Sequence, residues 1–365
     1  MNNFKKIGLT ALAGSLVTLG ATAGEMSVSG SVNTTLKFGD GGGNTGRSIG
    51  ADRDVTFSGG GELDNGTTFS MSTTTNDDLG LSASTTSITT PSFGSFTFGA
   101  GTGGHSGKYD EEVPQAYEQI SDANGSEMAN SIGNFLDQNF VGYTSPTLDL
   151  MGASVTAHVE YSPMASDETG ANGDGSQATY DATVGAAKSL GLTIGYEGLK
   201  LGFYGAERER TVPKVAGATG NYQHDEFNGV WYAKYSMGPV SIGYSESYID
   251  AGVTSSISAT SSTTAKSVRS GGGIYTGDQM SIAFNVNDNM SISYTTSDET
   301  YDTQDDAKTA VTTDDDVTES IDAIQIAYSM GGMSIKAYNM EITNPKQDDD
   351  AADQSVTEIA LGFAF

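Results

Sequence analysis

The chain has 365 residues, of which only 17% are charged, 48 are glycine and none is cysteine. Without cysteine there is no disulfide framework, Cys-ligated zinc site or thiol nucleophile. Acidic residues outnumber basic ones by 46 to 17, giving a formal net charge of −29. Such a charge repels nucleic acid, so no nucleic-acid partner is expected, and it favours cations.

Residues 1–23 have the order of a secretory signal peptide. Lys5 and Lys6 form the positive start, an apolar stretch follows, and Ala21-Thr22-Ala23 is a small-x-small cleavage site. We therefore expect an exported protein whose mature part, residues 24–365, is one domain. No later segment has the roughly twenty apolar residues of a membrane-spanning helix. These features leave a secreted protein, a periplasmic protein or an outer-membrane barrel.

Beyond the leader, apolar and polar residues alternate in the manner of β-strands. Met280, Ile282 and Phe284, for example, alternate with serine, alanine and asparagine. The predicted strands are 25–38, 52–63, 67–75, 79–88, 92–100, 140–145, 153–161, 180–196, 199–209, 227–237, 240–248, 269–286, 290–296, 319–330, 333–342 and 355–365. About sixteen strands is an even number, as bacterial single-chain outer-membrane barrels have.

The connections between these strands alternate between short turns and long loops. The short ones carry tight-turn residues: Asp64-Asn65-Gly66, Thr90-Pro91, Glu197-Gly198, Gly238-Pro239, Asn287-Asp288-Asn289 and Gly331-Gly332. The long ones, mostly acidic, are residues 39–51, 101–139, 162–179, 210–226, 249–268, 297–318 and 343–354. Short periplasmic turns and long outer loops are typical of a membrane barrel.

The last strand places Ile359, Leu361, Phe363 and Phe365 on one face and small or polar residues on the other. Across the strands, the less apolar face is made of Ser, Thr, Gly and Asn, which can line water and cannot pack a dry core. A strand that closes a barrel in lipid must be paired to its last residue. The sequence therefore predicts an all-β, transmembrane antiparallel barrel with water inside.

The segment from Phe140 to Pro146, Phe-Val-Gly-Tyr-Thr-Ser-Pro, follows the longest loop. That combination resembles the general porins of Gram-negative bacteria, particularly the alphaproteobacterial type. The resemblance covers the architecture of the mature chain and its terminal Phe365. It implies a homotrimer in the cell outer membrane, surrounded by lipid and lipopolysaccharide, with Phe365 recognised by the barrel-assembly machinery. It also implies that the third loop, residues 101–139, folds into the lumen and narrows it.

In such a constriction, acidic loop residues face basic wall residues across the opening. The acidic candidates are Asp110, Glu111, Glu112, Glu118, Asp122, Glu127 and Asp137. By strand parity, the basic candidates for the lumen are Lys37, Lys200, Arg208, Lys234, Arg269 and Lys336. Two departures stand out: Gly142 occupies a position where relatives often carry arginine, and the second loop shortens to Asn76-Asp77-Asp78. Trimer contacts are then expected on the strands between Thr67 and Ala100.

These features predict a passive diffusion channel for small hydrophilic solutes and ions, cation-preferring and without catalysis. A substrate-selective porin for sugars or peptides is an alternative, which would need inward aromatic residues such as Tyr204, Tyr232 and Tyr275. A secreted β-rich adhesin or surface-layer protein is a second alternative, which would be soluble without detergent.

Other motifs are outweighed by their context. The run from Gly41 to Gly46 matches a dinucleotide-binding pattern, but a strand follows it where that motif needs a helix. His105, His158 and His224 lack helical metal spacing. The runs 314–316 and 348–350 are all aspartate and read as solvated loop tips, with weak Ca²⁺ or Mg²⁺ binding as the alternative. No resident cofactor is expected.

Overall fold

The computed structural model describes residues 25–41, 45–77, 79–100, 102, 104–122, 136, 139–163, 184–210, 225–250, 252, 274–302 and 316–365. The expected signal peptide lies outside these residues. The strands are β1 (Glu25–Asp40), β2 (Gly46–Glu62), β3 (Thr68–Thr75), β4 (Leu81–Thr90), β5 (Gly94–Ala100), β6 (Phe140–Thr144), β7 (Leu148–Leu150), β8 (Ala153–Ser162), β9 (Val184–Tyr196), β10 (Leu199–Arg210), β11 (Glu226–Met237), β12 (Val240–Asp250), β13 (Ile274–Asn287), β14 (Met290–Asp302), β15 (Val317–Met330), β16 (Met333–Thr343) and β17 (Gln354–Ala364).

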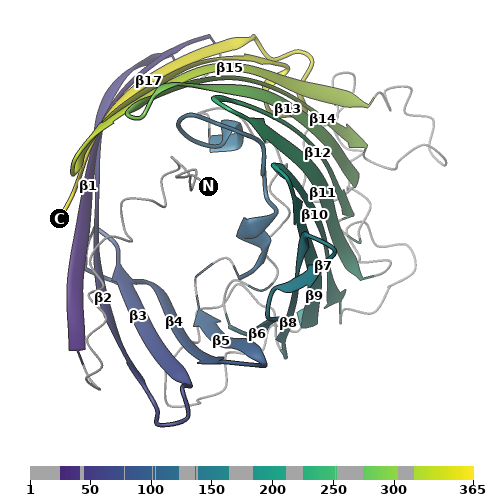
Figure 1. Ribbon diagram of the computed structural model, residues 1–365. Helices are drawn as coiled ribbons and strands as arrows, with labels where there is room; N and C mark the ends of the chain where they lie inside the picture. The colour runs from purple at the N-terminus through teal and green to yellow at the C-terminus, as the bar shows by residue number, and fades with distance from the viewer. Residues whose placement is uncertain are drawn as a thin grey trace.

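All of these strands belong to one antiparallel sheet that closes on itself, because β1 pairs with both β2 and β17 (Figure 1). The β1–β17 ladder runs from Ser31 opposite Ala364 to Asp40 opposite Ser355. The pairing continues to Phe365, whose N–H donates to Gly30 O at 3.0 Å while Gly30 N–H donates to Phe365 O at 2.8 Å. The seam is thus hydrogen-bonded to the last residue, and closure removes the sheet edges.

The sheet has sixteen strand positions although seventeen strands are distinguished. Both β6 and β7 pair with β8, so they are two parts of one position, interrupted at Ser145-Pro146. Pro146 has no N–H to donate to a ladder. The Ser145 hydroxyl accepts a bond from Ala157 N–H at 2.9 Å across the break. The predicted all-β barrel of about sixteen strands is confirmed, while the continuation of the sixth strand into β7 was missed.

Several strands extend beyond their predicted ends. β14, predicted to end at Thr296, continues to Asp302, and β15 begins at Val317. Their ladder persists because polar residues also form cross-strand pairs: the hydroxyls of Thr300 and Thr318 lie 2.7 Å apart. Alternation of apolar residues ends before the hydrogen bonding does.

The short turns have the expected chemistry. Between β9 and β10, Glu197 and Gly198 have φ values of +44° and +90°. Two successive positive φ angles match the right-handed twist of the flanking strands in a two-residue hairpin.

The two faces of the sheet have inverted polarity compared with a soluble protein. Large apolar side chains such as Leu190, Met280 and Ile324 are more than half exposed on one face. On the other face, Thr295 and Gln325 are fully buried. The oily face therefore points outward and the polar face inward. None of the helices in the described parts of the chain is long and apolar enough to cross a membrane.

Candidate functional site

Residues 104–122, here called the inner segment, run inside the ring of strands in Figure 1. The segment contains two short 3₁₀ turns, η3 (Ser106–Lys108) and η4 (Ile120–Asp122). Its contacts follow the wall in order, starting at β6 and β8, passing β9 to β13, and ending at β14 to β17.

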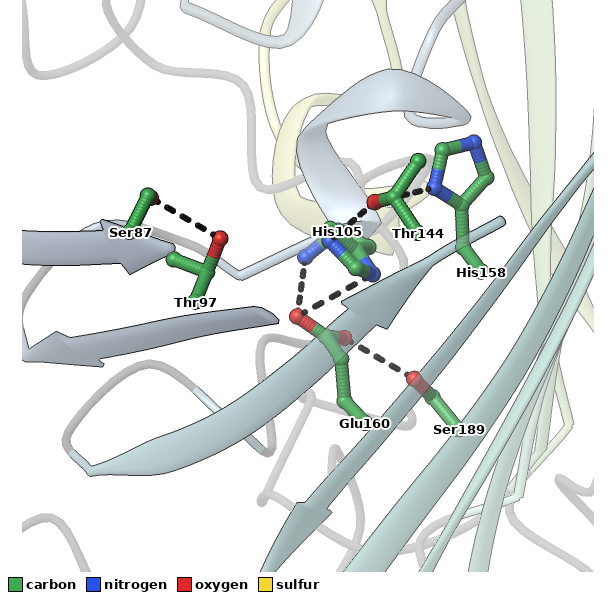
Figure 2. Close-up of polar contacts among 7 residues, drawn as sticks. All are labelled: Ser87, Thr97, His105, Thr144, His158, Glu160 and Ser189. Carbon is green, nitrogen blue, oxygen red and sulfur yellow. Dashed lines mark hydrogen bonds and ion pairs between the residues drawn. The ribbon is translucent and has the colours of Figure 1, made fainter. Parts of the chain in front are cut away.

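The first anchor is a polar cluster around His105 (Figure 2). His105 N–H donates to Glu160 Oε1 at 2.5 Å, and the Ser189 hydroxyl donates to Glu160 Oε2 at 2.8 Å. The Thr144 hydroxyl lies 3.3 Å from His105 Nε2 and 3.1 Å from His158 Nδ1. Burial, together with the nearby Lys108 and His158, lowers the pKa of His105 to about 3. The ring is therefore neutral at pH 7.

Three inward-facing glycines form seats for the inner segment. A Cβ atom at Gly191 would lie 2.4 Å from the Tyr109 hydroxyl, and one at Gly243 would lie 2.4 Å from Pro114 Cδ. At Gly142 it would lie 3.2 Å from His105 Cε1. Gly142, noted above as the place of a missing arginine, is therefore the position where the wall leaves room for His105.

In its middle, the inner segment packs on tyrosines of β10 and β11. Tyr109 is fully buried and stacks on Tyr204 with ring centroids 5.2 Å apart, and Tyr232 lies 6.3 Å away. Tyr204 and Tyr232 are 6% and 0% exposed. Two of the inward aromatic residues that a substrate-selective porin would need, Tyr204 and Tyr232, are thus present but covered by the inner segment. The third, Tyr275, is buried and stacks on Tyr301 with ring centroids 4.7 Å apart.

Glu112 is held by two wall lysines. Its Oε2 contacts Lys234 Nζ and lies 3.4 Å from Lys200 Nζ. Burial raises the pKa of this carboxyl, but the two ammonium groups outweigh burial and hold the pKa below its usual range. Glu112 is therefore ionised and electrically compensated in place.

The far end of the inner segment is fixed by hydrogen bonds to β13–β17. The Ser281 hydroxyl donates to Pro114 O at 2.5 Å, and Ala116 N–H donates to the Ser293 hydroxyl at 2.9 Å. The Gln325 side chain accepts from Tyr117 N–H at 2.8 Å and donates to Glu118 O at 2.7 Å.

A second cluster of charged residues surrounds Tyr117. The Tyr117 hydroxyl donates to Glu358 Oε1 at 2.6 Å, and Lys37 Nζ lies 2.9 Å from Glu358 Oε2. Lys336 Nζ lies 5.3 Å from the centre of the Tyr117 ring, a cation–π distance. Burial and the Glu358 and Asp122 carboxylates raise the pKa of Glu118 to about 8, although Lys37 and Lys336 act against the shift.

The remaining acidic candidates differ in environment. Burial and the neighbouring Asp110 raise the pKa of Glu111 well above its usual value. At the end of η4, partial desolvation raises the pKa of the Asp122 carboxyl, and Lys37 acts against the shift. The Asp110 carbonyl accepts from Gln119 Nε2 at 3.2 Å. Glu127 and Asp137 lie outside the described residues.

The structure brings some of the predicted basic residues to the inner segment and leaves others apart. Lys200 and Lys234 meet Glu112, while Lys37 and Lys336 lie near Tyr117. Arg208 is elsewhere on β10, with its Nε 2.5 Å from Glu226 Oε2. Arg269 lies outside the described residues. Sequence reasoning missed Glu160 and Glu358 as partners, since strand parity gives the face of a residue but not its height.

The wall opposite the inner segment is open and rich in hydroxyl groups. Every buried residue found in the described part of the chain has a number of 105 or higher, so β1–β5 contribute none. Hydroxyl groups pair across these strands: Thr56–Thr74 at 2.9 Å, Ser72–Thr85 at 2.8 Å, Ser87–Thr97 at 3.0 Å and Thr89–Ser95 at 3.0 Å. We call the inward surface of β3–β5, with Thr56 of β2 at its edge, the hydroxyl wall.

Among the described residues, no group of three or more His, Cys, Asp or Glu side chains is placed to hold a metal ion. His105 and His158 have ring centroids 4.8 Å apart and share Thr144. In the run of aspartates at 348–350, Asp350 N–H donates to Asp348 Oδ1 at 3.0 Å, which is a local turn contact.

No family model matches the chain, and no curated protein matches it in sequence. Solved structures do. Salmonella typhi OmpF in complex with daunomycin is 9% identical with a TM-score of 0.63, covering 94% of this chain and 98% of that one. An anion-selective porin from Comamonas acidovorans is 12% identical with a TM-score of 0.62, covering 94% and 100%. The outer membrane channel DcaP of Acinetobacter baumannii is 11% identical with a TM-score of 0.58, covering 94% and 98%.

These likenesses extend over almost the whole chain, and at such low identity they establish the fold. The fold is a porin-type β-barrel.

Proposed function

We propose that this protein is a porin of the cell outer membrane, through which small hydrophilic solutes and ions diffuse passively. The observation that carries the proposal is the inverted polarity of the closed sheet, with Met280 and Ile324 exposed outside and Thr295 and Gln325 buried inside. An oily exterior suits lipid, and a polar interior suits water. Transport of this kind requires no catalytic group.

We further propose that the inner segment is the constriction. Its contacts with β6–β17 support this role, because a segment attached to one side of the wall reduces the cross-section available to solutes. The general-porin assignment is supported by the fold. The alphaproteobacterial type rests on the Phe140 to Pro146 segment alone.

A cation preference follows from the overall charge of −29 and the acidic long loops. The inner segment contributes little to it, since Glu112 is compensated by two lysines and burial raises the pKa of Glu111, which disfavours its charged form. The preference is therefore expected to arise at the acidic mouth. Weak Ca²⁺ or Mg²⁺ binding at the aspartate runs stays a prediction.

The decisive experiment places the purified protein in a planar lipid bilayer. We expect stepwise conductance and, in a KCl gradient, a reversal potential that shows preference for K⁺. Absence of conductance from folded protein would reject the channel, and an anion-selective potential would reject only the charge preference.

We propose a homotrimer that contacts lipid and lipopolysaccharide over the rest of its exterior. Outward apolar side chains on β3–β5, including Phe69, Met71, Ile88, Phe96 and Phe98, are all at least 40% exposed and offer a contact face. The connection after β3 is short, and its Asp77 accepts a hydrogen bond from Arg53 N–H of the same chain at 2.7 Å. Contacts between subunits are therefore expected mainly on the outward face of β3–β5 and not on this loop. Electrophoresis without boiling should show a slow, trimeric band.

Assembly is the remaining part of the proposal. Phe365, at the end of the last strand, is 73% exposed, and its ring lies against Gly30, where a Cβ atom would approach to 2.8 Å. The side chain is thus available for recognition by the barrel-assembly machinery. Deletion of Phe365 should lower the amount of folded barrel in the outer membrane.

A further inference from the structure

The wall that remains open to solutes differs chemically from the wall that holds the inner segment. The sequences of β3, β4, β5 and β6 contain no charged residue. Their inward side chains are mainly serine and threonine, paired as hydroxyl with hydroxyl at 2.8–3.0 Å.

The hydroxyl wall lies in register with the anchor of the inner segment. Ser87 is opposite Thr97, Thr97 is opposite Gly142, and Gly142 is opposite Glu160. Glu160 accepts the backbone N–H of His105, and Figure 2 shows the Ser87–Thr97 pair beside this cluster. The hydroxyls therefore line the opening at the level where the inner segment begins.

On the side of the barrel where the inner segment docks, two carboxylates are already engaged. Glu112 has Lys200 and Lys234, and Glu358 has Lys37 and the Tyr117 hydroxyl. A passing ion therefore meets the compensated Glu112 and Glu358 on one side and, along β3–β6, only uncharged side chains on the other. The adjoining β2 carries the wall carboxylates Asp52 and Asp54. Along β3–β6, ions gain little to replace their hydration.

From this arrangement we propose that the hydroxyl wall is the solute-contacting surface of the constriction and that the preferred solutes are uncharged and hydroxyl-rich, such as sugars and polyols. The proposal rests on the proposed channel function and names its substrate class. Each hydroxyl donates one hydrogen bond and accepts two, so a paired hydroxyl keeps capacity for a second partner. A sugar can exchange its bonds to water for bonds to this wall at little cost.

The test compares solutes of one ring size and different charge in liposome-swelling assays: glucose, the cation glucosamine and the anion glucuronate. The assay contains 0.5 M KCl, at which the Debye length is below about 5 Å and the charge of the mouth is screened. We expect glucose to enter at least roughly twice as fast as either charged sugar. Faster entry of a charged sugar through a conducting channel would overturn the substrate class, whereas no conductance at all would overturn the proposed function.

A pair of double variants separates the wall from general effects of mutation. Thr85→Val with Thr97→Val removes two hydroxyls from the wall at nearly constant volume. Thr300→Val with Thr318→Val removes a hydroxyl pair, 2.7 Å apart, that lies on the outward parity of β14 and β15. We expect the wall variant to lose at least roughly half of its glucose rate at unchanged KCl conductance, and the control to keep both.

An unchanged glucose rate in a folded, conducting wall variant would overturn the role of the hydroxyls. An equal loss in the control would do so as well, because it would trace the effect to the barrel as a whole.

Discussion

Two halves of the barrel wall have the same backbone geometry but different interiors. β3–β5 are lined by Ser and Thr and contribute no buried residue in the described chain, whereas β8–β17 bury tyrosines, glutamates and glutamines, including Tyr204, Glu160 and Gln325 at the inner segment. Pairing in the ladder is continuous through both halves. The difference shows that this barrel obtains its closed shape from the backbone and its asymmetric lumen from side chains.

The covered half also explains how a polar interior can be packed. Its buried groups include Glu160, Gln325 and Glu358, each bonded to the inner segment or to a neighbouring strand. Buried polar groups are stable only when their hydrogen bonds are made. The hydroxyl wall does not need protein partners for all of its polar groups, since water can reach its hydroxyls.

The contrast between the two halves should be lost when the inner segment can no longer dock. Side chains added at the glycine seats should prevent docking. Gly191→Ala with Gly243→Ala places Cβ atoms 2.4 Å from Tyr109 and Pro114. Overpacking of this kind costs about 1–3 kcal/mol, so the inner segment should leave the wall and single-channel conductance should rise roughly twofold. Gly205→Ala is the control, because a Cβ atom there has its nearest neighbour at 3.7 Å. Equal conductance in both variants would show that the seats are unimportant.

Acid should loosen the first anchor. The pKa of His105 is lowered from 6.5 to about 3, primarily by burial and then by Lys108 and His158. A lowered pKa means that this group stabilises the docked segment above pH 6.5 and that the contribution is lost as pH falls from 6.5 towards 3. We expect greater protease sensitivity of the inner segment at pH 4 than at pH 7. The variant His105→Gln, which cannot gain a proton, should lack the part of this change that His105 causes.

Removing the Glu112 carboxylate should change the ion selectivity of the channel. Glu112→Gln leaves Lys200 and Lys234 without their shared partner. An unpaired unit charge about 8 Å from the ion path contributes about 0.5 kcal/mol in water, so the K⁺ to Cl⁻ permeability ratio should fall roughly twofold. Glu111→Gln is the matched control, because the neighbouring Glu111 is buried, its pKa is raised well above the usual value, and the two lysines pair with Glu112. A ratio that is unchanged in Glu112→Gln would contradict the compensation described here.

The smallest effect is expected at alkaline pH. Burial, Glu358 and Asp122 raise the pKa of Glu118 from 4.5 to about 8. With a raised pKa, its contribution to docking is full below pH 4.5 and is lost as pH rises through 8. Between pH 7 and 9 the side chain gains a negative charge, and K⁺ preference should increase by less than about twofold. Reversal potentials of Glu118→Gln should show a smaller step, and a full step in that variant would assign the titration to another group.

Much of the fold could be predicted because it depends on local rules. Alternation gave the strands and their faces, and Glu197-Gly198 gave a turn because both residues adopt positive φ. β7 was missed because it is only three residues long, which is too short to show an alternation of apolar and polar residues. The outer ends of β14 and β15 were missed because polar cross-strand pairs such as Thr300 and Thr318 continue the ladder after the apolar alternation stops.

The constriction could be predicted only in part. The length and acidity of residues 101–139 indicated a special loop, yet nothing local shows that Glu112 meets two lysines while Glu111 is buried beside it. Tyr204 and Tyr232 face inward as their parity requires, but only the position of Tyr109 covers them.

By itself, the sequence determined which side chains share the apolar outer face and which share the polar inner face, because a two-residue period assigns faces without knowledge of neighbours. The tertiary structure decided which lumen residues share a height, since strand register and the path of the inner segment bring together residues as distant as Tyr117 and Glu358. The division into a covered half and an open, hydroxyl-lined half therefore exists only in the closed barrel.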